Sequence, residues 1–178
     1  MWRLIGITPE KGVKDEQKRI VDFLNNGIDI FHIRKPNLTQ EQLKYYLNEF
    51  PTELRNRLTI HNHTSLALEF GLGGVHYNIQ NPFIKPIEKN LRKSYSSHSI
   101  SEMLEAIKTF DYVFLSPIFN SISKEGYNSK FRIDELKELN LINEKVIALG
   151  GVREENFEEL KQIGFGGAAL LGSLWKEK

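Results

Sequence analysis

Short apolar runs alternate with stretches of helical periodicity along the whole chain, and this alternation constrains the fold more than any other feature. Eight runs have the length of strands and end at Gly, Pro or polar residues. They are Leu4–Pro9, Ile28–Ile33, Arg57–His61, Gly74–Tyr77, Leu91–Tyr95, Asp111–Leu115, Val146–Leu149 and Ala168–Leu171. Strands that are apolar on both faces and alternate with helices form a parallel sheet covered by helices. Eight such units predict an α/β fold, a closed (β/α)8 TIM barrel.

The stretches between the runs carry helix signals. Capping boxes, in which a hydroxyl and a Gln or Glu three residues later satisfy each other's backbone N–H, begin two helices at Thr39 and Ser99. The other predicted helices are Asp15–Asn26, Thr64–Phe70, Ile133–Leu139 and Arg153–Ile163. Two prolines between residues 78 and 90 favour a short helix or none there.

The chain of 178 residues is short for such a barrel, whose usual size is ~250 residues. We therefore expect one compact domain over residues 1–178, with short loops and a minimal last helix. The alternative fold is an open doubly wound sheet. It would need a G-x-G-x-x-G turn after the first strand, where the chain reads Gly6-Ile7-Thr8-Pro9.

Composition excludes several classes of function. The net charge is +1, so no long-range field favours nucleic acid or an anionic membrane. The absence of cysteine excludes disulfides, thiolate zinc sites and cysteine nucleophiles. No apolar stretch approaches the ~18–20 residues of a membrane span, and no signal-peptide core precedes the first strand. We expect a cytoplasmic protein.

Two successive predicted strands end in small residues, at Gly150-Gly151 and at Gly172-Ser173. Glycine lets backbone N–H groups approach an anion closely, and a following helix N-terminus adds partial positive charge. The loops after the last two strands of a (β/α)8 barrel frequently hold a phosphate. The alternative for either pair is an ordinary tight turn.

All five histidines lie at or just after the end of a predicted strand: His32, His61, His63, His76 and His98. In a barrel this end is the catalytic mouth. The H-x-H spacing of His61 and His63 would turn both rings to one side of a strand, which suits zinc. Few carboxylates accompany them, which disfavours Mg²⁺. Alternatively, each histidine only caps a strand or forms local hydrogen bonds.

Two loops at the same end carry cations and hydroxyls. Arg34 and Lys35 follow the second strand, and a guanidinium matches phosphate oxygens in a bidentate way. Ser121, Ser123 and Lys124 follow the sixth strand and have the composition of an anion-binding loop. Solvated surface charge and a merely mobile loop are the alternatives.

An ordered set of six motifs covers nearly the whole chain. They are His32-Ile33-Arg34, the region of Asn62, Gly74-Val75-His76, Ser96-Ser97-His98-Ser99, Pro117-Ile118-Phe119 with Ser121-Ile122-Ser123-Lys124, and Leu149-Gly150-Gly151-Val152. This set resembles the thiamine phosphate synthase family, which also contains thiazole tautomerases. The resemblance implies a barrel enzyme of thiamine biosynthesis. A synthase joins hydroxymethylpyrimidine diphosphate to a thiazole phosphate and releases pyrophosphate with Mg²⁺, whereas a tautomerase isomerises a thiazole carboxylate phosphate.

Carried over by position, the resemblance assigns roles to individual residues. The backbone of Gly150, Gly151, Leu171 and Gly172, with Ser173 beside it, would hold the thiazole phosphate. The other contacts to substrate or pyrophosphate would be Arg34, Lys35, His61, Asn62, Ser96, Ser121, Ser123 and Lys124. His98 is the expected catalytic acid and base, because an imidazole can both give and take a proton near neutral pH.

The chain departs from the synthase pattern where that pattern binds metal and pyrophosphate. The family's Q-x-R-x-K reads His32, Arg34 and Pro36, so its second cation is missing unless Lys35 replaces it. Its two metal-binding aspartates correspond to Asn62 and Asn81. Replacing both carboxylates by amides should weaken Mg²⁺ binding, so we expect no metal at these positions and Mg²⁺ only if synthase activity is retained.

These departures leave three hypotheses. The first is a metal-independent, tautomerase-type proton transfer on a thiazole phosphate. The second is a divergent synthase, and the third is a phosphate-binding module without catalysis. In each, the partner is a small phosphorylated molecule rather than nucleic acid or a membrane, and a homodimer is left open.

Overall fold

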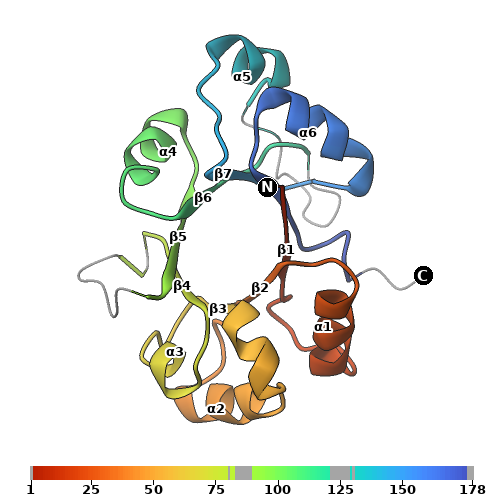
Figure 1. Ribbon diagram of the computed structural model, residues 1–178, viewed down its shortest axis with the longest axis vertical. Helices are drawn as coiled ribbons and strands as arrows, with labels where there is room; N and C mark the ends of the chain where they lie inside the picture. Colours follow the sequence, from red (N-terminus) through yellow and green to blue (C-terminus); the bar gives the residue numbers. More distant parts are fainter. Residues whose placement is uncertain (1, 80, 83–89, 121–128, 130, 176–178) are drawn as a thin grey trace.

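The computed structural model describes residues 2–79, 81–82, 90–120, 129 and 131–175, and its strands form a closed parallel barrel (Figure 1). Each strand pairs with the next one in the chain, and β8 closes on β1. The strands are β1 Arg3–Ile7, β2 Ile30–Ile33, β3 Leu58–Ile60, β4 Gly74–Tyr77, β5 Arg92–Ser97, β6 Tyr112–Leu115, β7 Val146–Ala148 and β8 Gly167–Leu170. The predicted TIM barrel is confirmed.

Helices surround the barrel on its outside (Figure 1). They are α1 Glu16–Asn25, α2 Gln40–Asn48, α3 Leu66–Glu69, α4 Ile100–Ala106, α5 Ile133–Leu139 and α6 Phe157–Ile163, with short 3-10 helices η1 Thr52–Arg57 and η2 Glu154–Asn156. Both bonds of the capping box at Thr39 are present. At Ser99 the hydroxyl accepts from the Glu102 N–H, while the Glu102 carboxylate accepts from the N–H of His98. None of the described helices is long and apolar enough to cross a bilayer.

The barrel interior has an apolar side and a polar side. Side chains from β1, β6, β7 and β8 form the apolar side, including Ile5, Phe114 and Ile147. Strands β2 to β5 instead place buried polar residues there, including His32, Thr59, His76 and Ser94. Barrel interiors are usually filled with branched apolar side chains. The polar half of this interior is therefore unusual for the fold.

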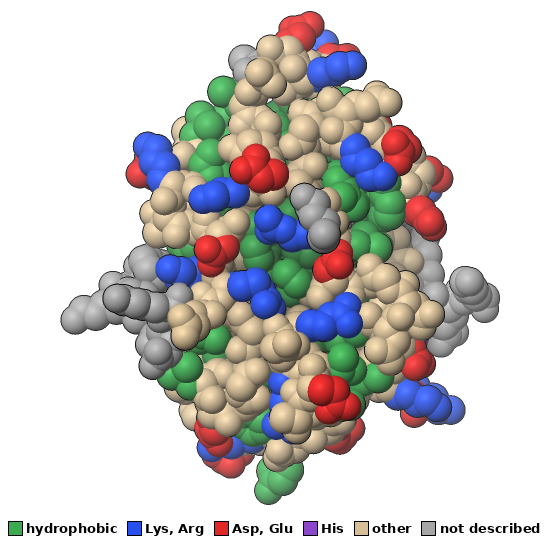
Figure 2. Space-filling view, in the orientation of Figure 1, with side chains coloured by type: hydrophobic (Ala, Val, Ile, Leu, Met, Phe, Trp, Pro, Cys, Tyr) green, Lys and Arg blue, Asp and Glu red, His purple; other side chains and the backbone are tan. Residues whose placement is uncertain are grey.

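The outer surface carries both signs of charge. In the view of Figure 2, Lys and Arg side chains surround the barrel axis together with Asp and Glu, and no His side chain is visible. This mixture agrees with the net charge of +1.

Candidate active site

The glycines after β7 are required by their surroundings. Gly150 and Gly151 have φ angles of +91° and +66°, which side chains rarely adopt. A Cβ at Gly150 would lie 2.8 Å from Pro117, and one at Gly151 would lie 2.5 Å from the carbonyl oxygen of Asn120. Within the described part of the chain, the N–H groups of Gly150, Gly151 and Gly172 have no hydrogen-bond partner. These N–H groups are therefore available to an anion.

The loops that carry these glycines are tied to one another. The Ser173 hydroxyl, after β8, donates to the carbonyl of Val152 in the loop after β7 at 3.0 Å. The Ile118 N–H donates to the Leu149 carbonyl at 2.9 Å, which prolongs the pairing of β6 with β7 beyond both strands. Leu171 packs against the apolar side of the interior. The predicted phosphate site is thus held in one arrangement.

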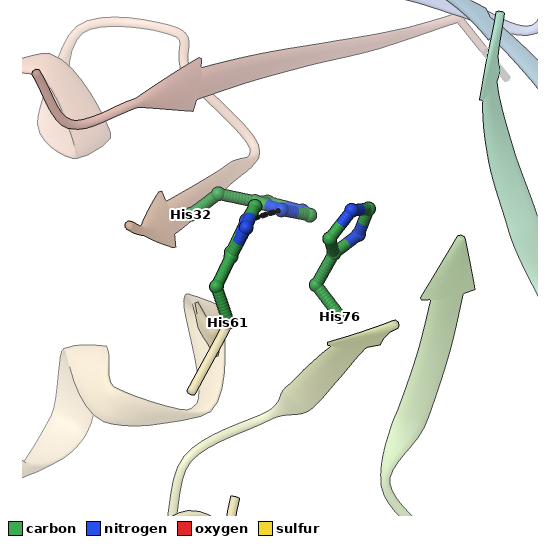
Figure 3. Close-up of side chains that lie close together, drawn as sticks. All are labelled: His32, His61 and His76. Atoms are coloured by element: carbon green, nitrogen blue, oxygen red, sulfur yellow. Dashed lines mark hydrogen bonds between the residues drawn. The ribbon is translucent and has the colours of Figure 1, made fainter. Parts of the chain in front are cut away.

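Three of the histidines meet inside the barrel rather than at its rim. His32 on β2, His61 directly after β3 and His76 on β4 turn their rings toward one another (Figure 3). The rings of His61 and His76 stack with their centroids 4.1 Å apart. His32 and His76 are completely buried and His61 is 9 % exposed. These three histidines lie at or directly after the carboxyl ends of β2, β3 and β4, as predicted, but their rings are buried inside the barrel.

Hydrogen bonds engage both ring nitrogens of His32 and His76 and one of His61, as buried polar groups require. His32 Nδ1 lies 2.9 Å from His61 Nε2, and His32 Nε2 lies 2.6 Å from the Tyr112 hydroxyl. The two nitrogens of His76 lie 2.8 Å and 2.7 Å from the hydroxyls of Ser94 and Ser96. Ser96, a predicted substrate contact, is therefore also a partner of the cluster.

Burial keeps the clustered imidazoles neutral. Desolvation is the main cause that lowers the pKa of each ring, and it lowers the pKa of His76 to about 3. Neighbouring charge acts in the same direction, from Arg92 on His32 and from Arg34 on His61 and His76. No carboxylate among the described residues raises the pKa of any of these rings, so a positive charge on them lacks a counter-ion there.

Asn81 fastens the ends of two of the strands that carry the cluster. Its side-chain N–H2 donates to the backbone carbonyls of His61 and of His76, at 3.0 Å each. Only a donor can occupy this place, because both partners are acceptors. The aspartate that the synthase pattern has at position 81 would instead place carboxylate oxygens against two carbonyl oxygens.

We expect Asn81→Asp to lower the free energy of unfolding by about 1–3 kcal/mol, because it removes two hydrogen bonds and opposes like partial charges. Asn120→Asp is the matched control, since the side-chain oxygen of Asn120 accepts from the Ser129 N–H at 2.8 Å and a carboxylate can do the same. Urea denaturation of both variants measures the difference. Equal stability of the two would contradict the role of Asn81.

The residues at the family's metal positions do not fit Mg²⁺. Asn81 presents its N–H2 to carbonyls, as described above. The amide nitrogen of Asn62 donates to the Lys35 carbonyl at 3.4 Å, and its buried oxygen has no partner among the described residues. One amide oxygen without a carboxylate is a poor site for a hard cation that prefers several oxygen ligands.

The two cations after β2 have different surroundings. Arg34 is 38 % exposed and pairs with Glu10 at 2.5 Å, while its backbone N–H donates to the Thr8 hydroxyl at 2.7 Å. Lys35 is only 3 % exposed, and its ammonium lies 2.7 Å from the equally buried carboxylate of Glu16. Arg34 therefore has the exposure that a phosphate ligand needs, whereas Lys35, predicted for the same role, has its ammonium in an internal ion pair.

His98 follows β5 and is exposed, as a proton-transfer group should be. Its Nδ1 lies 3.0 Å from the backbone carbonyl of Ser116. A carbonyl can only accept, so Nδ1 carries the hydrogen and Nε2 carries the lone pair of the neutral ring.

His63 does not share a side with His61, contrary to the H-x-H prediction: it has φ +50° and its Nε2 contacts the Leu38 carbonyl.

The polar loop after β6 holds the remaining predicted contacts, Ser121, Ser123 and Lys124, which lie outside the described residues.

The polar interior was not predicted from the sequence, although a signal was present. Polar residues stand at alternate positions in the pairs Thr59/His61 and Ser94/Ser96, and His76 lies on the strand between them. Alternate residues of a strand share a face, so these pairs indicate one polar surface.

Backbone N–H groups after β7 and β8 that lack a partner among the described residues, with titratable groups after the earlier strands, are the arrangement typical of barrel enzymes that bind a phosphate. The family model described as thiamine monophosphate synthase matches residues 4–174. The chain belongs to the thiamine phosphate synthase family. The resemblance read from the six motifs is thereby confirmed.

Individual relatives agree with this assignment. The thiamine-phosphate synthase of Clostridium acetobutylicum is 26% identical, over 97% of this chain and 87% of its own. The crystal structure of thiamine phosphate pyrophosphorylase from Bacteroides thetaiotaomicron is 36% identical with a TM-score of 0.84, covering 97% of this chain and 84% of that one. The Pyrococcus furiosus pyrophosphorylase, at 21% identity and a TM-score of 0.76, covers 98% and 88% and shares the fold.

Proposed function

We propose that the protein binds a thiazole phosphate at the barrel mouth and catalyses a tautomerase-type proton transfer whose chemistry needs no metal ion. The N–H groups of Gly150, Gly151 and Gly172 would hold the phosphate. Arg34, exposed beside the mouth, would add a guanidinium contact. Such a reaction needs a positioned acid and base and no charged leaving group, which suits a site with amides at positions 62 and 81.

The observation that carries this proposal is the hydrogen bond between His98 Nδ1 and the Ser116 carbonyl, 3.0 Å long. It fixes the tautomer in which Nε2 accepts a proton. His98 would take a proton from one atom of the thiazole and return it to another, so that no second reactant is consumed. The carbonyl of Ser116 would stabilise the ring while it is positively charged.

We expect His98→Gln to reduce kcat/KM for isomerisation of the thiazole carboxylate phosphate by about 10²- to 10⁴-fold. His63→Gln is the control, because His63 also lies in a loop after a strand but contacts the Leu38 carbonyl. Nuclear magnetic resonance of the two tautomers follows the reaction. Undiminished turnover by His98→Gln, or no turnover by the natural chain, would contradict the proposal.

The names of the relatives favour a second candidate, thiamine-phosphate synthase activity. The relative from Clostridium acetobutylicum carries that name, and Arg34 could contact a diphosphate. Pyrophosphate release from hydroxymethylpyrimidine diphosphate and thiazole phosphate, with and without added Mg²⁺, tests it. Release in that assay with no isomerisation would assign the synthase reaction. Binding of thiazole phosphate without either turnover would leave a phosphate-binding module.

A further inference from the structure

We propose that His32, His61 and His76 form a binding site for one divalent transition-metal ion inside the barrel. Each ring offers one nitrogen, and the three nitrogens lie within 4.8 Å of one another. The rings come from neighbouring parallel strands, which are themselves fixed by the barrel, and Figure 3 shows them turned toward a common point. This site is separate from the family's magnesium positions at residues 62 and 81.

The separations require only small movements. In a tetrahedral zinc site each Zn–N distance is ~2.0–2.1 Å, which places the ligating nitrogens roughly 3.4 Å apart. His32 Nδ1 and His61 Nε2 are already 2.9 Å apart. The nitrogens of the remaining pairs lie no more than 4.8 Å apart. Rotation of the imidazole rings about their side-chain bonds can shorten these distances to the length that a metal site needs. An ion would replace the hydrogen bond between His32 and His61.

The second nitrogens of two rings already have suitable partners. A metal-bound histidine typically donates its other ring N–H to an oxygen, which fixes the tautomer and the orientation of the ring. Tyr112 supplies such an oxygen to His32 Nε2 at 2.6 Å. Ser94 and Ser96 supply one to each nitrogen of His76, so whichever nitrogen does not bind the ion keeps its partner.

The chemistry of the ligands selects the ion. Three imidazoles, with no carboxylate in the cluster among the described residues, suit Zn²⁺, Co²⁺, Ni²⁺ or Cu²⁺ and do not suit Mg²⁺ or Ca²⁺. Positive charge from Arg34 and Arg92 acts on the same rings. It opposes a cation, so we expect weaker binding than in a site that includes carboxylates, and tighter binding in Arg34→Gln.

The test is titration of chelator-treated protein, without a polyhistidine tag, with Co²⁺ and Zn²⁺. We expect one ion per chain and a visible cobalt absorption band of a nitrogen-ligated site. In His32→Gln and in His76→Gln the affinity should fall by more than about 10-fold, which is the effect of losing even a hydrogen-bond partner of a ligand. His63→Gln, a histidine outside the cluster, should bind as the natural chain does.

Circular dichroism checks whether each variant is folded. If His32→Gln or His76→Gln is unfolded, His61→Gln is used in its place. His61 is the preferred substitute because it lies after β3 and not within a strand. No stoichiometric binding by the natural chain would overturn the proposal. Equal binding by the cluster variants and by His63→Gln would overturn it as well, since the ion would then be bound elsewhere.

Discussion

Lys35→Met is expected to lower the free energy of unfolding by about 3–5 kcal/mol, because it leaves the Glu16 carboxylate buried without its counter-ion. The two side chains are each 3 % exposed and their charged atoms lie 2.7 Å apart. Glu16 also accepts from the Tyr46 hydroxyl at 2.5 Å, and Lys35 donates to the Pro9 carbonyl at 2.8 Å. The pair therefore joins the loop after β1, α1, the loop after β2 and α2. Guanidinium chloride denaturation measures the loss.

Two further variants separate charge from packing. Lys44→Met removes an ion pair with Glu69 whose side chains are 30% and 47% exposed, and it should cost much less stability than Lys35→Met, because solvent screens an exposed pair. The double variant Lys35→Met with Glu16→Met should recover much of the stability, because an apolar pair can replace a buried ion pair at little cost. If the single Lys35→Met variant were as stable as Lys44→Met, the buried pair would have no structural role.

Stability is expected to fall steeply as the pH drops below about 6.5, the ordinary pKa of histidine. Burial lowers the pKa of His32, His61 and His76 in the folded chain, that of His76 to about 3. Below pH 6.5 the unfolded chain therefore binds more protons than the folded chain, and acid favours unfolding. Each neutral buried histidine contributes up to about 1.4 kcal/mol per pH unit. Urea denaturation at pH 7.5, 6.0 and 5.0 gives the slope.

The contribution of the cluster is isolated by comparing slopes rather than absolute stabilities. His76→Gln removes one of the titrating groups and should make the dependence on pH shallower. His63→Gln leaves the three clustered rings in place and should retain the slope of the natural chain. Identical slopes for all three proteins would show that the acid sensitivity arises from other groups.

The sequence predicts the barrel well because each part of that prediction is local. Eight apolar runs, the capping residues Thr39 and Ser99 and the paired glycines each depend on a few consecutive residues. The strand boundaries are less well predicted: β5 continues to Ser97, beyond the predicted Tyr95. The polar residues Ser94 and Ser96 interrupt the apolar pattern of this strand, because they face the polar side of the interior.

The site is only partly predictable because its decisive contacts join distant residues. Nothing near Lys35 in the sequence indicates that its ammonium forms an ion pair with Glu16, 19 residues earlier. The sequence also does not indicate which way the His32 side chain points. All four residues of β2 are buried, so the apolar pattern does not distinguish the two faces of the strand. His98 differs because the strand, the capping box and the ring follow one another within a few residues. The place of Arg34 after a strand is likewise local, while the roles of Arg34 and His98 stay predictions.

The amide at position 81 also restricts how such a chain can change over generations. Two strand ends depend on Asn81 as a donor, so one substitution to the carboxylate of the synthase pattern would loosen both. Another donor for the carbonyls of His61 and His76 would have to arise first. The order in which substitutions accumulate is therefore constrained, and a lineage that acquires this amide leaves carboxylate chemistry at position 81 by a step that is hard to reverse.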